Sequence, residues 1–113
     1  MNNMNTNRVL FECVEGTVTI RSPEIIYIEA YDHKNVIHTR SQQYHIYESI
    51  DSLEMRLKEN GLIRVHRSYI VNIDHVQKIN NYVLTLDCNT EIPVSKAKYK
   101  HIKELVLHGG KII

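Results

Sequence analysis

The sequence predicts a mostly β domain of about eight to ten short antiparallel strands, with one inserted helix and one C-terminal helix. Three observations support this fold class. Short runs of β-branched and aromatic residues recur at hairpin-scale spacing, with turn residues between them. A helical period of apolar residues occurs only at residues 50–60 and after Ser95. The strand-like runs also follow one another closely, which argues against parallel βαβ units.

The first half of the chain is predicted to form strands joined by short turns. Residues 9–21 indicate a hairpin around Glu15-Gly16, because glycine supplies the positive φ of a tight turn. Residues 25–31, IIYIEAY, are predicted as a central strand. Alternation of apolar and polar residues then marks two more strands, residues 36–39 and 43–46.

The inserted helix is predicted over residues 50–60, where apolar side chains recur on one face. Ser49 or Asp51 can cap its start, and Asn60-Gly61 can end it through a left-handed residue. Ser95 can cap the last helix. Between the helices the predicted strands are residues 62–65, 69–71, 76–79, 82–86 and 91–94, with the turn between the third and the fourth at Asn80-Asn81.

At 113 residues the chain has the size of one domain. We place that domain at residues 9–108, between a flexible N-terminal segment, 1–8, and a tail, 109–113. The N-terminus lacks the basic and apolar parts of a signal peptide, and no apolar run approaches the roughly 18 residues of a membrane span. A cytoplasmic protein without membrane insertion is expected. Cys13 and Cys88 each stand singly, which favours buried thiols over a disulfide.

Enzymatic and metal-binding roles are not expected from this sequence. The chain has seven histidines, but they show neither the close Cys spacing nor the His-Glu-x-x-His pattern of a zinc site. A Gly-x-Ser-x-Gly elbow and a Gly-rich phosphate loop are also absent from the sequence. We therefore predict no catalytic residues, no metal and no cofactor.

Charge is distributed unevenly along the chain. Residues 1–55 contain 4 Lys or Arg and 8 Asp or Glu, a net charge of −4, whereas residues 56–113 contain 10 and 5, a net charge of +5. Such polarity within one domain indicates an anionic partner for one face.

The most informative segment is RVHRSYIVN, which begins at Arg64 and sets donors into a strand-like run. Arg67 and Ser68 break the alternation where a strand would enter a bend, so a projecting loop is predicted. Arginine on such a bend can grip phosphate or pair bidentately with guanine. His66, Arg67 and Ser68 are thus candidate contacts to nucleic acid. The alternative is an edge strand with its polar residues facing water.

A second cluster, Lys96, Lys98 and Lys100, is predicted on the first turns of the last helix, where the helix dipole disfavours cations. Free N–H groups and lysines together suit an anion, so Lys96 and Lys98 are candidate contacts. The alternative is that these lysines simply extend into water.

The third candidate is the turn around Asp32, in which His33, Lys34 and Asn35 offer donors. An asparagine amide can read adenine in the major groove. Alone this is an ordinary turn, and it gains a functional interpretation only together with the other two loops.

With these clusters in place, the sequence resembles the LytTR family of bacterial DNA-binding domains over about residues 17–107. The motifs that carry the resemblance are IIYIEA (25–30), RVHRSYIVN with the following IDHVQKI (64–79), and EIPVSKAKYKHI (91–102). The combination of His-Arg-Ser-x-x-Val-Asn with Pro-Val-Ser-Lys at this spacing is specific.

The resemblance implies an elongated β fold in which three loops, and no recognition helix, enter the major groove. In this sequence the family's contact positions fall on residues 33–35, on Arg67 with its two neighbours, and on Lys96. It also implies a transcription regulator acting on repeated duplex sites, as a homodimer or with a regulatory protein partner. Family members usually follow a receiver domain, for which this chain has no room, so a stand-alone regulator or a fragment is expected.

Two other functions remain open from the residues. A β-rich RNA-binding module would need exposed aromatic side chains for stacking, and only Tyr69 lies in a candidate loop. A protein-interaction regulator would need an exposed apolar patch.

Overall fold

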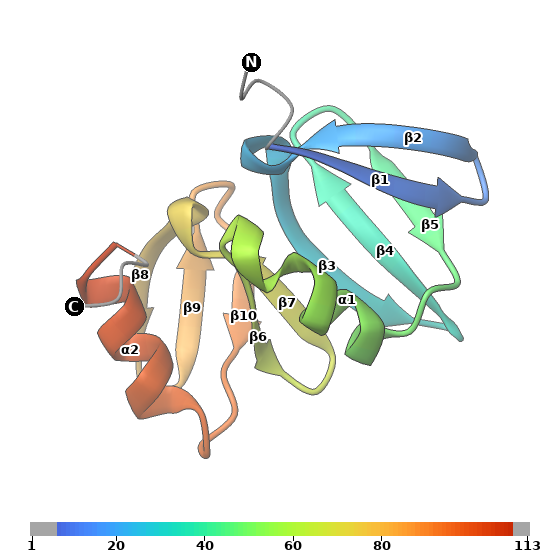
Figure 1. Ribbon diagram of the computed structural model, residues 1–113. Coiled ribbons are helices and arrows are strands. Elements are labelled where there is room, and N and C mark those ends of the chain that lie inside the picture. Colours follow the sequence, from blue (N-terminus) through green and yellow to red (C-terminus); the bar gives the residue numbers. More distant parts are fainter. Residues whose placement is uncertain (1–6, 110–113) are drawn as a thin grey trace.

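The computed structural model of the chain describes residues 7–109 (Figure 1). Within them the fold is mostly β, with two antiparallel sheets and two α-helices, which confirms the predicted fold class. The strands are β1 (Arg8–Cys13), β2 (Gly16–Arg21), β3 (Ile25–Tyr31), β4 (Lys34–Thr39), β5 (Gln43–Ile46), β6 (Leu62–His66), β7 (Tyr69–Asn72), β8 (Val76–Asn80), β9 (Val83–Leu86) and β10 (Glu91–Pro93). The helices are α1 (Ile50–Leu57) and α2 (Tyr99–Leu107), with the 3-10 turns η2 (Ser22–Glu24), η3 (Lys58–Asn60) and η4 (Ile73–His75).

The larger sheet has seven strands in the order β2-β1-β5-β4-β3-β7-β6. β3 is an interior strand with the predicted bounds, and it pairs with both β4 and β7. α1 packs on one face of this sheet through Leu53 and Leu57, both 0% exposed. Full burial of such a side chain stabilises the fold by roughly 1.5–3 kcal/mol. The helix is therefore anchored by its apolar face.

The smaller sheet has the order β10-β9-β8 and packs with α2 against the β6 and β7 end of the larger sheet. This second core joins Val65 and Val71 of the larger sheet to Leu84 and Ile92 of the smaller one and to Ile102 of α2. The chain measures 40 × 38 × 24 Å. It is thus flattened, and not elongated along one axis as the resemblance implied.

The helical segment begins at the predicted residue and stops at the predicted glycine, but α1 itself ends at Leu57 and the 3-10 turn η3 forms residues 58–60 of the predicted helix. The Ser49 hydroxyl oxygen accepts a 3.1 Å hydrogen bond from the Ser52 N–H, which caps the first turn. At the other end, η3 stops at Gly61, whose φ of 80° is the left-handed conformation that glycine tolerates best.

α2 begins later than predicted, so the expectation that Ser95 caps it is wrong. The Ser95 N–H instead donates to the carbonyl oxygen of Val65 at 2.9 Å, which keeps the backbone of Ser95 beside β6. A turn at residues 96–98 follows, and the helix starts at Tyr99 with Lys98 at the N-cap. Among residues 7–109 the Ser95 hydroxyl oxygen is buried and has no hydrogen-bond partner.

The β8–β9 turn also lies one residue later than expected. Asn80 pairs with Val83, which leaves Asn81 and Tyr82 as the two central residues, with φ of 53° and 65°. A two-residue turn of this type needs positive φ at both positions, because its twist must match that of the strands. Tyr82 is therefore in the turn and not in β9.

Several expectations concern the ends and the cysteines. Residues 1–6 of the predicted flexible segment and residues 110–113 of the predicted tail lie outside the described residues, whereas Arg8 already belongs to β1. Cys13 and Cys88 are both free thiols, but neither is fully buried as predicted, because Cys13 is half-buried and Cys88 is exposed in the turn after β9. Among residues 7–109, neither helix has the length and hydropathy of a membrane span. The same residues bring no three His, Cys, Asp or Glu side chains together in a metal-binding arrangement.

Candidate nucleic-acid interface

The three polar loops predicted from the sequence lie side by side along one edge of the molecule. The Ala30 N–H, beside the β3–β4 turn, donates to the carbonyl oxygen of Ser68 in the β6–β7 bend at 2.9 Å. The bond from Ser95 to Val65 then places the segment before α2 beside the same bend. In Figure 1 these loops follow the lower edge of the molecule. Antiparallel pairing of β3 with β7 brings about this convergence, since the end of one strand meets the start of the other.

The β3–β4 turn projects His33 but not Asn35. Asp32 and His33 occupy its two central positions, with φ of 51° and 65°, and both are exposed, while Lys34 is half-buried. Asn35 is 6% exposed, and its amide Nδ2 donates to the Glu48 carbonyl oxygen at 2.6 Å. This amide supports the connection into α1. The Asn35 amide is therefore not exposed to read adenine, and the prediction of a base contact there is wrong.

The β6–β7 bend, residues 66–68, exposes Arg67. Among residues 7–109, no hydrogen bond or ion pair engages the Arg67 guanidinium. The His66 ring nitrogen Nδ1 accepts a 3.1 Å hydrogen bond from the Ser68 N–H, which places the ring proton of the neutral imidazole on Nε2. The ring also lies against Tyr69, with centroids 5.6 Å apart. His66 thus shapes the bend, while Arg67 is free to contact a ligand.

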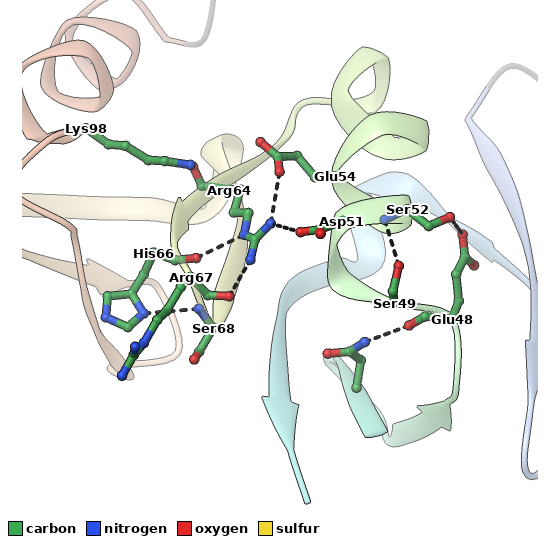
Figure 2. A network of polar contacts seen from close by, with 11 residues as sticks. Glu48, Ser49, Asp51, Ser52, Glu54, Arg64, His66, Arg67, Ser68 and Lys98 are labelled. Carbon is green, nitrogen blue, oxygen red and sulfur yellow. Dashed lines mark hydrogen bonds and ion pairs between the residues drawn. The ribbon is translucent and has the colours of Figure 1, made fainter. Parts of the chain in front are cut away.

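Arg64 belonged to the same sequence cluster, but it points into the protein (Figure 2). Its side chain is 14% exposed and forms ion pairs with Asp51 and Glu54 of α1. Burial works against the charge of Arg64, but the hydrogen bonds to the two carboxylates outweigh it and hold its pKa above the ordinary value. Arg64 therefore stays charged and is not available to contact a ligand.

The segment before α2 contributes Lys96, which is exposed. Lys98 is half-buried, and its Nζ donates to the Arg64 carbonyl oxygen at 3.4 Å (Figure 2). Since α2 starts at Tyr99, the expectation of lysines on its first turns holds only for Lys100. Lys96 is the more accessible cation of this segment.

Two exposed residues at this edge were missed by the sequence analysis. Tyr31, at the end of β3, is 68% exposed and pairs with Lys34 across the turn. Residues two apart on a strand lie on the same face, so the position of Tyr31 two residues after the polar Glu29 could have indicated that its side chain faces away from the core. Asp32 places a carboxylate next to the candidate donor His33 in the turn, which opposes the binding of a polyanion.

Comparison with known proteins identifies this arrangement. Residues 15–107 match the family model of the LytTr DNA-binding domain. The chain belongs to this family. The LytTr match contains all three loops and both helices, so the edge described above lies wholly within the DNA-binding domain.

Proteins of similar sequence come from several bacteria. The sensory transduction protein LytT of Bacillus cereus is 30% identical over 97 residues, which cover 81% of this chain and 39% of that protein. The transcriptional regulatory protein YpdB of Escherichia coli K12 is 32% identical over 89 residues, covering 74% of this chain and 36% of YpdB. This LytTr chain thus spans about two-fifths of the length of the curated relatives it matches.

A solved structure agrees with the fold. The LytTr DNA-binding domain of a putative methyl-accepting/DNA response regulator from Bacillus cereus superposes with a TM-score of 0.72 at 25% identity. The match covers 89% of this chain and 96% of the other. The arrangement of strands and helices around the three loops is therefore that of a LytTr domain.

Proposed function

We propose that this chain is a sequence-specific bacterial transcription regulator, which binds duplex DNA by placing its three loops in the major groove. The observation that carries the proposal is the convergence of donor-bearing loops on one edge, through the backbone bonds from Ala30 to Ser68 and from Ser95 to Val65. Membership of the LytTr DNA-binding domain family supports duplex DNA as the ligand. The similar proteins named as transcriptional regulatory proteins support a role in transcription.

The side chains divide into two kinds of contact. Arg67 is the proposed reader of bases, because an unpaired, exposed guanidinium can pair bidentately with guanine O6 and N7. Lys96 is a compact point charge on a flexible stem, which suits a phosphate. His33, Lys34, Lys98, His66 and Ser68 flank these two and complete the proposed contact surface.

In the cell, the proposed setting is the cytoplasm, with the domain bound to repeated sites. A homodimer on DNA or a regulatory protein partner would then supply the control of binding. Repeated sites increase affinity because the second binding event takes place at a high effective concentration.

The test is selection of bound duplexes from a random pool, with the wild-type chain and with Arg67→Ala. The expected result is a defined repeated sequence for the wild type and a loss of base preference at one position of each repeat for the variant. Single-stranded RNA should compete poorly with the selected duplex. Enrichment of no sequence, or stronger competition by RNA, would contradict the proposal.

A further inference from the structure

The Arg64 guanidinium lies between α1 and the β6–β7 bend and binds both (Figure 2). On the helix side, Nη1 donates to Asp51 Oδ1 at 2.5 Å and to Glu54 Oε1 at 3.1 Å. On the bend side, Nη2 donates to the Arg67 carbonyl oxygen at 2.6 Å, and Nε donates to the His66 carbonyl oxygen at 3.3 Å. One planar group thus ties two acidic side chains to the backbone of two consecutive loop residues.

This geometry requires arginine. The guanidinium is rigid and presents its donors in one plane, so that orienting one side of the plane orients the other. A lysine ammonium would keep the charge but could not hold two carboxylates and two carbonyls at fixed angles. The carbonyl oxygen of Arg64 also accepts the bond from Lys98, so the same residue joins the bend to the segment before α2.

The contacts are not needed to attach α1 to the sheet. Leu53 and Leu57, both fully buried, anchor the helix, and Ser49 caps it. The side chain of Asp51 is 84% exposed and that of Glu54 is 36% exposed, so these carboxylates add little apolar burial of their own. Both carboxylates instead contact the Arg64 guanidinium, which holds the main-chain carbonyl oxygen of Arg67.

We infer that Arg64, oriented by Asp51 and Glu54, is a positioning residue for DNA recognition. It fixes the main chain from which the Arg67 side chain projects, and it sets the spacing between this bend and Lys98. The inference rests on the proposed function and adds the residues that control its specificity. Two acidic side chains would then support the binding of a polyanion through the arginine that they orient.

The test is a titration of two duplexes, the selected sequence and a scrambled one, with the Asp51→Asn/Glu54→Gln double variant. Loosening the bend should weaken binding of the selected duplex by about tenfold, because a reading group must be held by its supporting contacts. The scrambled duplex should bind the double variant as tightly as it binds the wild type, or slightly more tightly, because the variant has lost two negative charges. Glu59→Gln, an exposed acidic residue after α1, is the matched control and should keep the wild-type ratio.

Arg64→Lys should reproduce the loss of specificity while keeping the charge, since lysine lacks the planar guanidinium and its fixed set of N–H donors. Thermal unfolding shows that each variant is folded, and amide NMR signals of residues 66–68 report on the bend without DNA. Unchanged bend signals together with an unchanged ratio of the two affinities in the double variant would overturn the inference. A wild-type chain that prefers no duplex would instead overturn the proposed function, and with it the role of Arg64 and its two acidic partners in recognition.

Discussion

The Arg64 side chain donates a 2.6 Å hydrogen bond to the main-chain carbonyl oxygen of Arg67. Two arginines three residues apart therefore have opposite roles. Arg64 holds the backbone of the bend from inside the protein, and Arg67 is an exposed side chain on that bend. The difference is set by α1, whose Asp51 and Glu54 face the first arginine and not the second. Preorganisation of this kind lowers the entropic cost of ordering a loop when a ligand binds.

Arg67→Ala should weaken binding of the selected duplex by about 1–3 kcal/mol, because a bidentate contact to one base is lost. Binding of scrambled duplexes should change much less. The fold should remain intact, because no described residue hydrogen-bonds to the Arg67 side chain. Fluorescence anisotropy titrations would measure both affinities. Arg21→Ala is the matched control, since this exposed arginine ends β2 at the opposite edge of the sheet. Equal losses in the two variants would argue against base reading by Arg67.

Lys96→Ala should weaken binding to all duplexes by a similar factor, because a phosphate contact carries no sequence information. The slope of log K against log salt should become shallower by about 1, since one fewer counterion is released. A salt series with selected and scrambled duplexes would measure this change. Lys58→Ala, in η3 near the start of β6, should leave the slope unchanged. A loss confined to the selected sequence would instead assign base reading to Lys96.

Asp32→Asn should tighten binding to every duplex. The residue lies at a central position of the β3–β4 turn with φ of 51°, a conformation that asparagine also tolerates, so the turn should persist. A unit charge roughly 8 Å from a phosphate in water contributes about 0.5 kcal/mol of repulsion, which corresponds to a two- to threefold change in affinity. The effect should fade at high salt. Glu24→Gln, in the 3-10 turn before β3, is the control at the far end of that strand. Weaker binding by the Asp32 variant would place the turn away from the phosphates.

Most of the fold could be predicted from the sequence because its signals are local. The strand over residues 25–31, the Ser49 cap and the Gly61 stop follow from propensity and capping chemistry within a few residues of each site. The start of α2 could not be predicted, because the N–H of Ser95 is bound to Val65, thirty residues away. Local capping preference is overridden by that long-range contact.

The candidate site was predicted at the level of loops but not of individual side chains. Arg64 and Arg67 are alike in the sequence, and only the packing of α1 across β6 makes Arg64 an internal residue that holds the bend while Arg67 stays exposed. Asn35 was expected to face solvent as a turn residue, yet it is the second residue of β4 and points toward the Glu48 carbonyl. In both cases the partner is an element distant in sequence, which no local pattern identifies.

Asn72→Ala should destabilise the fold by about 3 kcal/mol. This side chain is 2% exposed, and its amide donates to the carbonyl oxygens of Ser22 and Ile25 at 3.1 and 2.9 Å. Its Oδ1 also accepts from the Asp74 N–H at 3.0 Å, so the variant would remove three hydrogen bonds to the backbone at about 1 kcal/mol each. The final asparagine of the RVHRSYIVN segment is thus a structural residue. Urea unfolding would measure the loss, and Asn80→Ala on the exposed face of β8 should change stability by less than about 0.5 kcal/mol.

Glu48→Gln should reduce the loss of stability at acid pH. The hydrogen bonds from Arg56 hold the pKa of Glu48 below its ordinary value of 4.5, against the opposing effect of burial, and Ser52 adds a further bond. A carboxylate whose pKa is lowered by folding stabilises the native state fully above pH 4.5, and this contribution disappears as the pH falls through the lower folded-state pKa.

Thermal unfolding between about pH 7 and about pH 3 would measure this dependence. Arg56→Gln removes the principal cause of the shifted pKa of Glu48 and should flatten the same part of the curve. If either variant retained the wild-type decline below pH 4.5, the bonds between Glu48 and Arg56, at 2.9 and 3.1 Å, would not be its source. The Asn35 amide, which holds the main-chain carbonyl of Glu48, links this pair to the start of β4 and hence to the turn that carries His33.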